Sequence, residues 1–236
     1  MSNPKSKKTK NASQDNGKPT RDQLIVDYAK DQIEEKMQAS AMDINCFCRD
    51  GFVHVSGMVD VLAEKQRAEE IIGKIEGVRK IENKITVAMD SNITDKHMEK
   101  EVLLRFQEYP HDDAVRGLGV KVHDGGASLL GHVDNLKSAH DAMDLASQVR
   151  GIKHVVNNIT IDTLGDYPDT TISNHIIQQY SQIPIGYKDI HRKVSGGVVT
   201  LTGYVDNLQE VELAGEIAKG TEGVKKVRNR LRARDK

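Results

Sequence analysis

Apolar residues recur at two different spacings along the chain, and the spacing changes in the same order three times. Stretches 24–37, 98–106 and 172–183 place apolar residues three to five positions apart, which is typical of an amphipathic helix. Stretches 44–49, 118–122 and 190–194 follow, and in them apolar and polar residues alternate, which indicates a β-strand. A glycine-containing turn and a second alternating stretch come next, so each pair of strands is predicted to form a hairpin.

The segments that begin at these turns repeat one another. Segments 51–85, 125–159 and 197–231 align without a gap, and glycine, valine, aspartate, leucine, alanine and asparagine keep their register in all three. A second helix is predicted to start near the repeated aspartate. A third strand is predicted to start after the last repeated glycine. In the three copies the aspartates are Asp60, Asp134 and Asp206, and the glycines are Gly77, Gly151 and Gly223.

The order of elements predicts an α+β protein of three tandem α-β-β-α-β domains. Each is expected to be a three-stranded mixed sheet with two helices on one face. The boundaries are 21–90 (unit 1), 94–163 (unit 2) and 168–236 (unit 3). Residues 1–20 are polar and rich in lysine, and they cannot bury enough apolar surface to fold, so we expect a disordered basic tail.

The repeated frame resembles the BON domain, named for bacterial osmotically induced and nodulation proteins. The resemblance is carried by the strand VTLTGYV, the helix after it, and the segments GVRKIENKI, GIKHVVNNI and GVKKVRNRL. It covers roughly residues 21–234 as three copies. It implies a bacterial protein of a non-enzymatic family, whose members are mostly associated with the cell envelope, phospholipid surfaces and osmotic or general stress. One cytoplasmic branch of the family binds potassium.

Composition and charge agree with several small domains. Aromatic residues make up 4% of the chain and tryptophan is absent, which is lean for one large core. The net charge is −1, but unit 1 carries −4, unit 2 carries −3 and unit 3 carries +3. No apolar stretch resembles a signal peptide or a membrane span. The expected location is therefore cytoplasmic, with membrane association and a periplasmic location as alternatives.

The repeated polar residues favour a structural role. An aspartate at a helix start accepts backbone N–H groups, so Asp60, Asp134 and Asp206 are interpreted as helix caps. No second titratable group recurs beside them, and catalysis is not expected. The glycine segments lack the spacing of a phosphate-binding loop. Six of the nine histidines lie in unit 2, but no pair shows metal-ligand spacing, so neither a metal nor a catalytic site is predicted.

The most distinctive surface feature is the last predicted strand. Its alternate residues form a row of five cations on one face: Lys226, Arg228, Arg230, Arg232 and Arg234. One interpretation is a solvated outer face, paired with acidic residues of the same or a neighbouring domain. The other is a binding site for an anionic surface such as lipid headgroups. Nucleic acid fits less well, because the face lacks stacking aromatic residues and a recognition helix.

Three apolar residues are candidates for partner contacts. Phe47 stands where units 2 and 3 have lysines, so it is expected to project from the outer face of its sheet. The first helix of unit 3 is more apolar than one buried face requires, and Ile177 and Tyr180 are its candidate contact residues.

The leading functional hypothesis is a stress-related or envelope-associated binding protein that contacts anionic phospholipid. The first alternative is a cytoplasmic potassium-responsive sensor, in which backbone carbonyls between domains would hold the ion. The second is a structural subunit, either of a homo-oligomer or of a larger assembly. Apart from potassium under the first alternative, no cofactor is expected.

Overall fold

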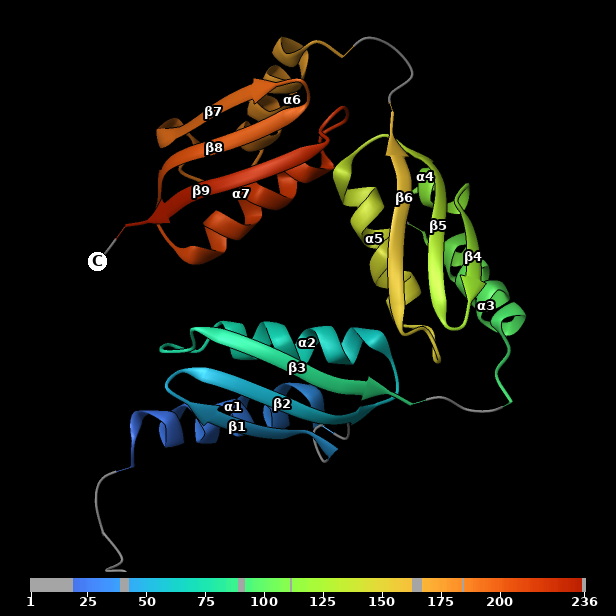
Figure 1. The fold of residues 1–236 in the computed structure, drawn as a ribbon. Helices are drawn as coiled ribbons and strands as arrows, with labels where there is room; N and C mark the ends of the chain where they lie inside the picture. Colours follow the sequence, from blue (N-terminus) through green and yellow to red (C-terminus); the bar gives the residue numbers. More distant parts are fainter. Residues whose placement is uncertain are drawn as a thin grey trace, which may run out of the picture.

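The computed structural model contains the same succession of elements in each unit (Figure 1). It describes residues 19–38, 43–88, 92–110, 112–162, 167–183 and 185–234, so the predicted tail lies almost entirely outside the described residues. Unit 1 comprises α1 (Arg21–Met37), β1 (Asn45–Arg49), β2 (Phe52–Val59), α2 (Leu62–Gly73) and β3 (Lys80–Val87). Unit 2 comprises α3 (Asp95–Glu108), α4 (Asp113–Arg116), β4 (Gly119–His123), β5 (Gly126–Val133), α5 (Leu136–Ser147) and β6 (His154–Ile161). Unit 3 comprises α6 (Asp169–Ser181), η2 (Tyr187–Asp189), β7 (Ile190–Ser195), β8 (Val198–Val205), α7 (Leu208–Gly220) and β9 (Lys226–Ala233).

Each sheet is mixed, as predicted. The second strand of each unit lies in the centre, antiparallel to the first and parallel to the third. The register is the same in all three: Val53 pairs with Cys48 and Ile81, and Val199 pairs with Val194 and Val227. The α+β fold of three tandem α-β-β-α-β units is therefore confirmed.

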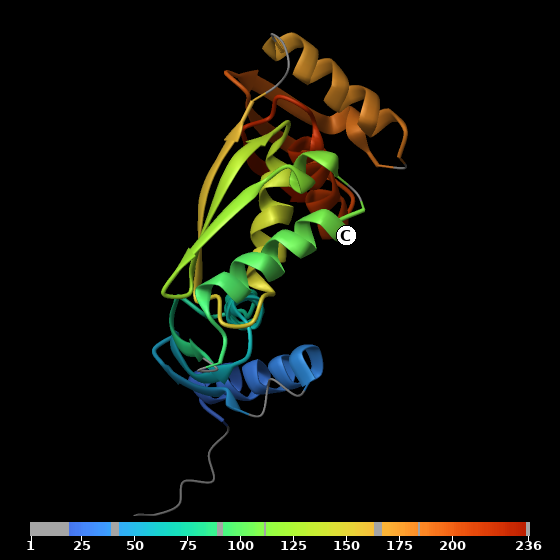
Figure 2. The same ribbon diagram turned by 90° about the vertical axis from the view of Figure 1, so that its right-hand side faces the viewer.

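The two long helices of each unit cover one face of its sheet, and the other face is left open (Figures 1 and 2). The covered face holds alternate residues of each central strand, which are all buried: Val53, Val55, Ala127, Leu129, Val199 and Leu201. Burying such side chains contributes roughly 1.5–3 kcal/mol each. The open face therefore presents strand side chains that the helices do not cover.

The helix starts follow from local sequence. Thr20 and Gln23 form a capping box at the start of α1, in which the Thr20 hydroxyl accepts the Gln23 N–H at 3.3 Å and the Gln23 side chain accepts the Thr20 N–H at 2.8 Å. The Thr94 hydroxyl caps α3 by accepting the His97 N–H at 3.3 Å. In unit 3 the first helix begins at Asp169, with Pro168 at the N-cap. The short elements α4 and η2 had no signal in the hydrophobic pattern.

Candidate functional site: the open sheet face of unit 3

The five cations of the last strand lie where the alternation placed them. Lys226, Arg228, Arg230, Arg232 and Arg234 are all exposed on the open side of unit 3, whereas Val227 and Leu231 of the same strand point towards the helices. Alternate residues of a strand are about 7 Å apart, so the charged groups form a regular row. The row runs along β9, which is an edge strand of its sheet.

The neighbouring strands extend this row into a face. Arg228 pairs in register with Thr200 of β8, which pairs with Lys193 of β7. Arg230 pairs with Thr202, and Arg232 pairs with Tyr204. None of the residues of β7, β8 and β9 is an aspartate or a glutamate. The open face of unit 3 therefore combines cations with hydroxyl groups and carries no carboxylate on its strands.

One of the five cations differs from the others. The Arg234 guanidinium is paired with Asp206, at 3.1 Å between Nη1 and Oδ1, and with Asp189. These contacts join the end of β9 to η2 and to the residues before α7. The five cations therefore fit neither a fully paired outer face nor a row that is entirely free to bind an anionic surface. Arg234 is paired within its own unit, while Lys226, Arg228, Arg230 and Arg232 have no ion pair with any residue in the part of the chain that the structure describes.

The equivalent face of unit 1 has a different character. Glu82 of β3 pairs with His54 at 2.7 Å and with Lys84 at 3.0 Å. The hydrogen bond and charge of Lys84, with a smaller effect of His54, hold the pKa of the Glu82 carboxyl below its usual range. Phe47 projects from this face as predicted and is 62% exposed, near the His54 ring. Its role as a partner contact stays a prediction.

The prediction that Tyr180 contacts a partner is wrong. Its side chain is 1% exposed, and its hydroxyl donates to the carbonyl of Ala214 in α7 at 2.8 Å. Burial raises the pKa of this phenol well above its usual range. The extra apolar residues of α6 thus serve the core of unit 3, since Tyr180 joins its two helices. Ile177 is half-buried, and its partner role stays a prediction.

The interpretation of the repeated aspartates as helix caps is also wrong. The N-cap residues are Val61, Asn135 and Asn207, each one position later, and the two asparagine side chains accept backbone N–H groups of the first turn. The Asp60 and Asp206 carboxylates bind arginines instead. An asparagine caps a helix as well as an aspartate does, so the sequence pattern was ambiguous by one residue.

A different aspartate in each unit holds the hairpin, and sequence reasoning missed it. Asp22 accepts the backbone N–H groups of Asp50 at 2.7 Å and Gly51 at 3.0 Å. Asp95 makes the same contacts to the β4–β5 turn, and Asp169 makes them to the β7–β8 turn. In the sequence, these residues could have been found as an aspartate in the first turn of each first helix. A gapless alignment of the units does not superpose them, because Asp22 and Asp95 are 73 residues apart, whereas the turn glycines Gly51 and Gly125 are 74 apart.

These contacts also explain a group that resembles a metal site. Asp95, His123 and Asp124 bring ligand atoms within 4.8 Å of one another. The two oxygens of Asp95, however, already accept the N–H groups of Asp124 and Gly125. Because units 1 and 3 have the same arrangement, the group is explained as the hairpin contact of unit 2.

The repeated asparagine ties the third strand to the second helix. The side-chain amides of Asn83 and Asn229 donate to the carbonyls of Lys65 and Val211, at 3.1 and 2.7 Å. Their amide oxygens accept the backbone N–H two residues further along the strand, as that of Asn157 also does. The repeated asparagine thus binds the backbone of its own unit, which is a structural role.

A comparison with protein families agrees with three repeated units. The sequence model of the BON domain matches residues 22–89, 94–163 and 168–235. No curated protein matches the chain as a sequence relative. Among solved structures, CdsD, a structural protein of the type III secretion system of Chlamydia trachomatis, is 15% identical, with 87% of this chain and 92% of that chain covered and a TM-score of 0.25. The periplasmic domain of the type III secretion inner membrane protein PrgH from S. typhimurium is 10% identical, with 86% and 99% covered and a TM-score of 0.23.

At such low identities and TM-scores, these similarities carry no functional argument. Among the described helices, none is both long enough and apolar enough to cross a membrane.

Proposed function

The chain belongs to the BON domain family, and from this premise we propose that it is a non-enzymatic binding protein whose third unit contacts anionic phospholipid. The observation that carries this proposal is the open face of unit 3. Four of its exposed cations, Lys226, Arg228, Arg230 and Arg232, have no ion-pair partner among the described residues, and its strands carry no carboxylate.

The shape and chemistry of this face suit a headgroup layer. A sheet presents its alternate side chains on one broad surface, so several cations can reach a membrane together. Each lysine or arginine near an anionic membrane contributes about 1 kcal/mol, so four together would give a moderate affinity that salt weakens. Tyr204, which is exposed beside Arg232, has the amphipathic ring that is favoured at membrane interfaces.

Co-sedimentation with vesicles tests the proposal. We expect the protein to pellet with vesicles of phosphatidylcholine and phosphatidylserine but to stay in the supernatant with phosphatidylcholine alone. Replacing two cations, as Arg228→Glu with Arg232→Glu, should weaken binding by at least about thirtyfold, because about 2 kcal/mol of attraction is lost.

A matched control carries the same change of charge on another surface. Lys96→Glu with Lys100→Glu alters two exposed lysines of α3 and should leave vesicle binding unchanged. Equal losses in the two double variants would show that only net charge matters and would remove unit 3 as the site. Failure of the unaltered protein to bind the anionic vesicles would overturn the phospholipid proposal altogether.

A further inference from the structure

At the joint between units 1 and 2, the start of α2 contacts the turn after α5. Asp60, just before α2, pairs with Arg150, just after α5, at 3.4 Å between Oδ1 and Nη2. Leu62, the first residue of α2, belongs to unit 1 in sequence but packs into the hydrophobic core of unit 2 and is only 6% exposed. An apolar side chain and an ion pair thus hold units 1 and 2 together.

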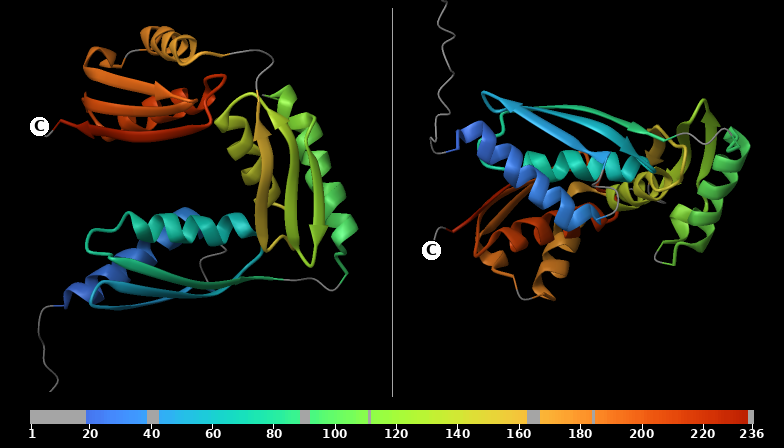
Figure 3. Two further views of the ribbon diagram at one scale, coloured as in Figure 1. Left: turned by 45° about the horizontal axis from the view of Figure 1, so that its top comes forward. Right: turned by 90° about the horizontal axis from the view of Figure 1, so that it is seen from below.

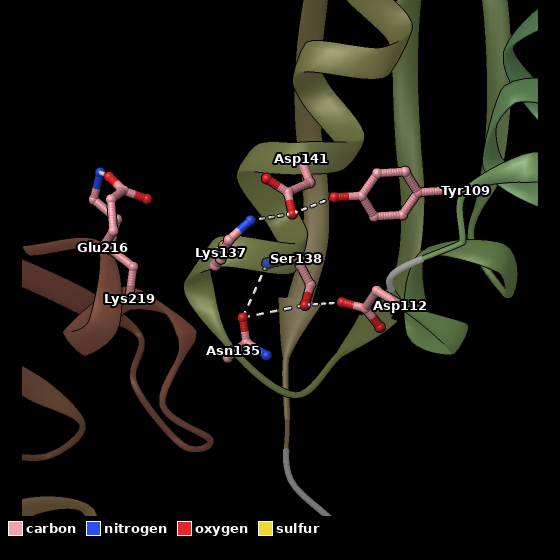
Figure 4. Close-up of polar contacts among 8 residues, drawn as sticks. All are labelled: Tyr109, Asp112, Asn135, Lys137, Ser138, Asp141, Glu216 and Lys219. Atoms are coloured by element: carbon pink, nitrogen blue, oxygen red, sulfur yellow. Dashed lines mark hydrogen bonds and ion pairs between the residues drawn. The ribbon is translucent and has the colours of Figure 1, made fainter. Parts of the chain in front are cut away.

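The second joint uses the corresponding parts of units 2 and 3 (Figure 4). The carbonyl of Asp134, just before α5, accepts the N–H of Gly223, just after α7, at 2.9 Å. Lys137 in the first turn of α5 is held by Asp141 at 2.6 Å, and its side chain lies against Gly220. Glu216 and Lys219 of α7 lie on the opposite side of this joint.

The two joints are equivalent by alignment. Asp60 corresponds to Asp134, and Arg150 corresponds to Glu222, the neighbour of Gly223. In both, the start of the second helix of one unit meets the turn after the second helix of the following unit. Such a contact joins a helix start on one unit to a turn on the next unit. In a row of three units, the helix start of unit 3 and the turn of unit 1 therefore have no contact of this kind.

The free helix start is in unit 3. Leu208, the first residue of α7, corresponds to Leu62 and Leu136. The side chain of Leu62 is buried and that of Leu136 is half-buried, but that of Leu208 is 72% exposed. Leu213, further along the same helix, is also exposed. Glu210 and Glu212 add negative charge beside these leucines.

The free receiving turn is in unit 1, after α2. A groove of about 810 Å³ lies beside it, lined by apolar and charged residues of α1 and of the turn: Arg21, Leu24, Ile25, Tyr28, Lys74, Ile75 and Glu76. Leu24 and Tyr28 are exposed there. Arg21 and Lys74 carry positive charge, which is opposite to that of Glu210 and Glu212. Glu76 stands at the position that aligns with Arg150 of the first joint.

We propose that this protein associates head to tail with a second copy of itself, with Leu208 of one protomer docking into the groove of unit 1 of the next. The contact would repeat the joint that the chain already forms twice. The start of α7 and the turn after α2 lie at the open side of the C-shaped row of units (Figures 1 and 3). Because the interface is heterologous, repeated docking gives a ring if the rotation closes and a filament if it does not.

Sedimentation velocity over a range of concentrations tests the proposal on the full chain. The unaltered protein should form larger species as its concentration rises. Leu208→Glu and Tyr28→Glu should each weaken association by at least about tenfold, equivalent to about 1.4 kcal/mol. Both side chains are exposed, so the variants should fold, and circular dichroism checks this. Leu104→Glu, at an exposed leucine of α3 away from both surfaces, is the control and should associate normally.

Mixing the two variants distinguishes this interface from a symmetric one. The Leu208→Glu protein keeps its groove and the Tyr28→Glu protein keeps its Leu208, so together they should form dimers and nothing larger. A protein that remains monomeric at every concentration would overturn the proposal. So would association that survives Leu208→Glu, or scattering that shows Leu208 closing onto unit 1 of its own chain.

Discussion

At the scale of single residues, one aspartate in the first helix of each unit binds the backbone of the hairpin turn. Asp22, Asp95 and Asp169 each accept two N–H groups of a hairpin turn. A carboxylate makes stronger hydrogen bonds than a neutral acceptor, because its charge draws the donor closer. Each unit therefore fixes its hairpin against its first helix through one side chain.

Asp22 gives a pH-dependent prediction. The N–H groups of Asp50 and then Gly51 hold the pKa of the Asp22 carboxyl below its ordinary value of 3.8. The ionised form is thus favoured by folding, and its contribution is present above the unfolded-state pKa and is lost as pH falls through the folded-state pKa. We expect Asp22→Asn to lower the free energy of unfolding at neutral pH, and the difference from the unaltered protein to shrink in acid.

Urea unfolding at a series of pH values measures this difference. Asp31→Asn, at an exposed carboxylate of the same helix, is the matched control and should follow the unaltered protein throughout. A loss for Asp22→Asn that stays constant down to acid pH would show that the hydrogen bonds do not depend on charge.

At the scale of elements, a glycine in each central strand lets the chain pass close to the strand beside it. Gly57, Gly131 and Gly203 have φ values of 146°, 131° and 119°, a region that other residues rarely adopt. A Cβ atom on Gly203 would lie 2.0 Å from the carbonyl oxygen of Asp189, which is backbone and cannot rotate away. The entry of the chain into β7 therefore depends on this glycine.

We expect Gly203→Ala to lower the free energy of unfolding by at least about 3 kcal/mol. The strained backbone angle alone costs about 1–3 kcal/mol, and the clash of the Cβ atom adds to it. Gly186→Ala in the same unit is the control, because a Cβ atom there would meet nothing within 4 Å. Thermal unfolding of both variants measures the difference. Equal stability of the two variants would contradict the close approach of η2 to β8.

At the scale of the whole molecule, each unit has its own core and the joints between units are small. The buried residues of the three hydrophobic clusters follow the unit boundaries except for Leu62, which belongs to the cluster of unit 2. Val87, which is half-buried, packs against the clusters of both unit 1 and unit 2. The stability of unit 1 should therefore be linked to that of unit 2 through few side chains.

Leu62 and Leu208 provide a comparison at aligned positions. Leu62→Ala should lower the free energy of unfolding by about 2–5 kcal/mol, because a buried contact is removed from the joint. Leu208→Ala should change it by less than about 0.5 kcal/mol at concentrations where protomers are separate, because this side chain is exposed. Urea unfolding measures both. Similar losses for the two variants would contradict the buried position of Leu62.

The sequence by itself determined the repeated unit, its mixed sheet and the outward row of cations. These depend on apolar periodicity and on turn glycines, which act between residues that are close along the chain. Gly51, Gly125 and Gly197, for example, have the positive φ that a tight hairpin turn requires.

Only the tertiary structure decided which side chains are exposed and unpaired, and so able to contact a ligand or partner. Tyr180 and Ile177 were both expected to contact a partner, but Tyr180 is buried in the core of unit 3, where its hydroxyl donates to the carbonyl of Ala214 on another helix. Arg234 continues the row of cations but is paired with Asp189 and Asp206, which come from distant parts of unit 3. Leu62 and Leu208 align, yet only Leu62 packs into the core of another described unit. Burial and pairing depend on partners far away in the chain, and no local pattern records them.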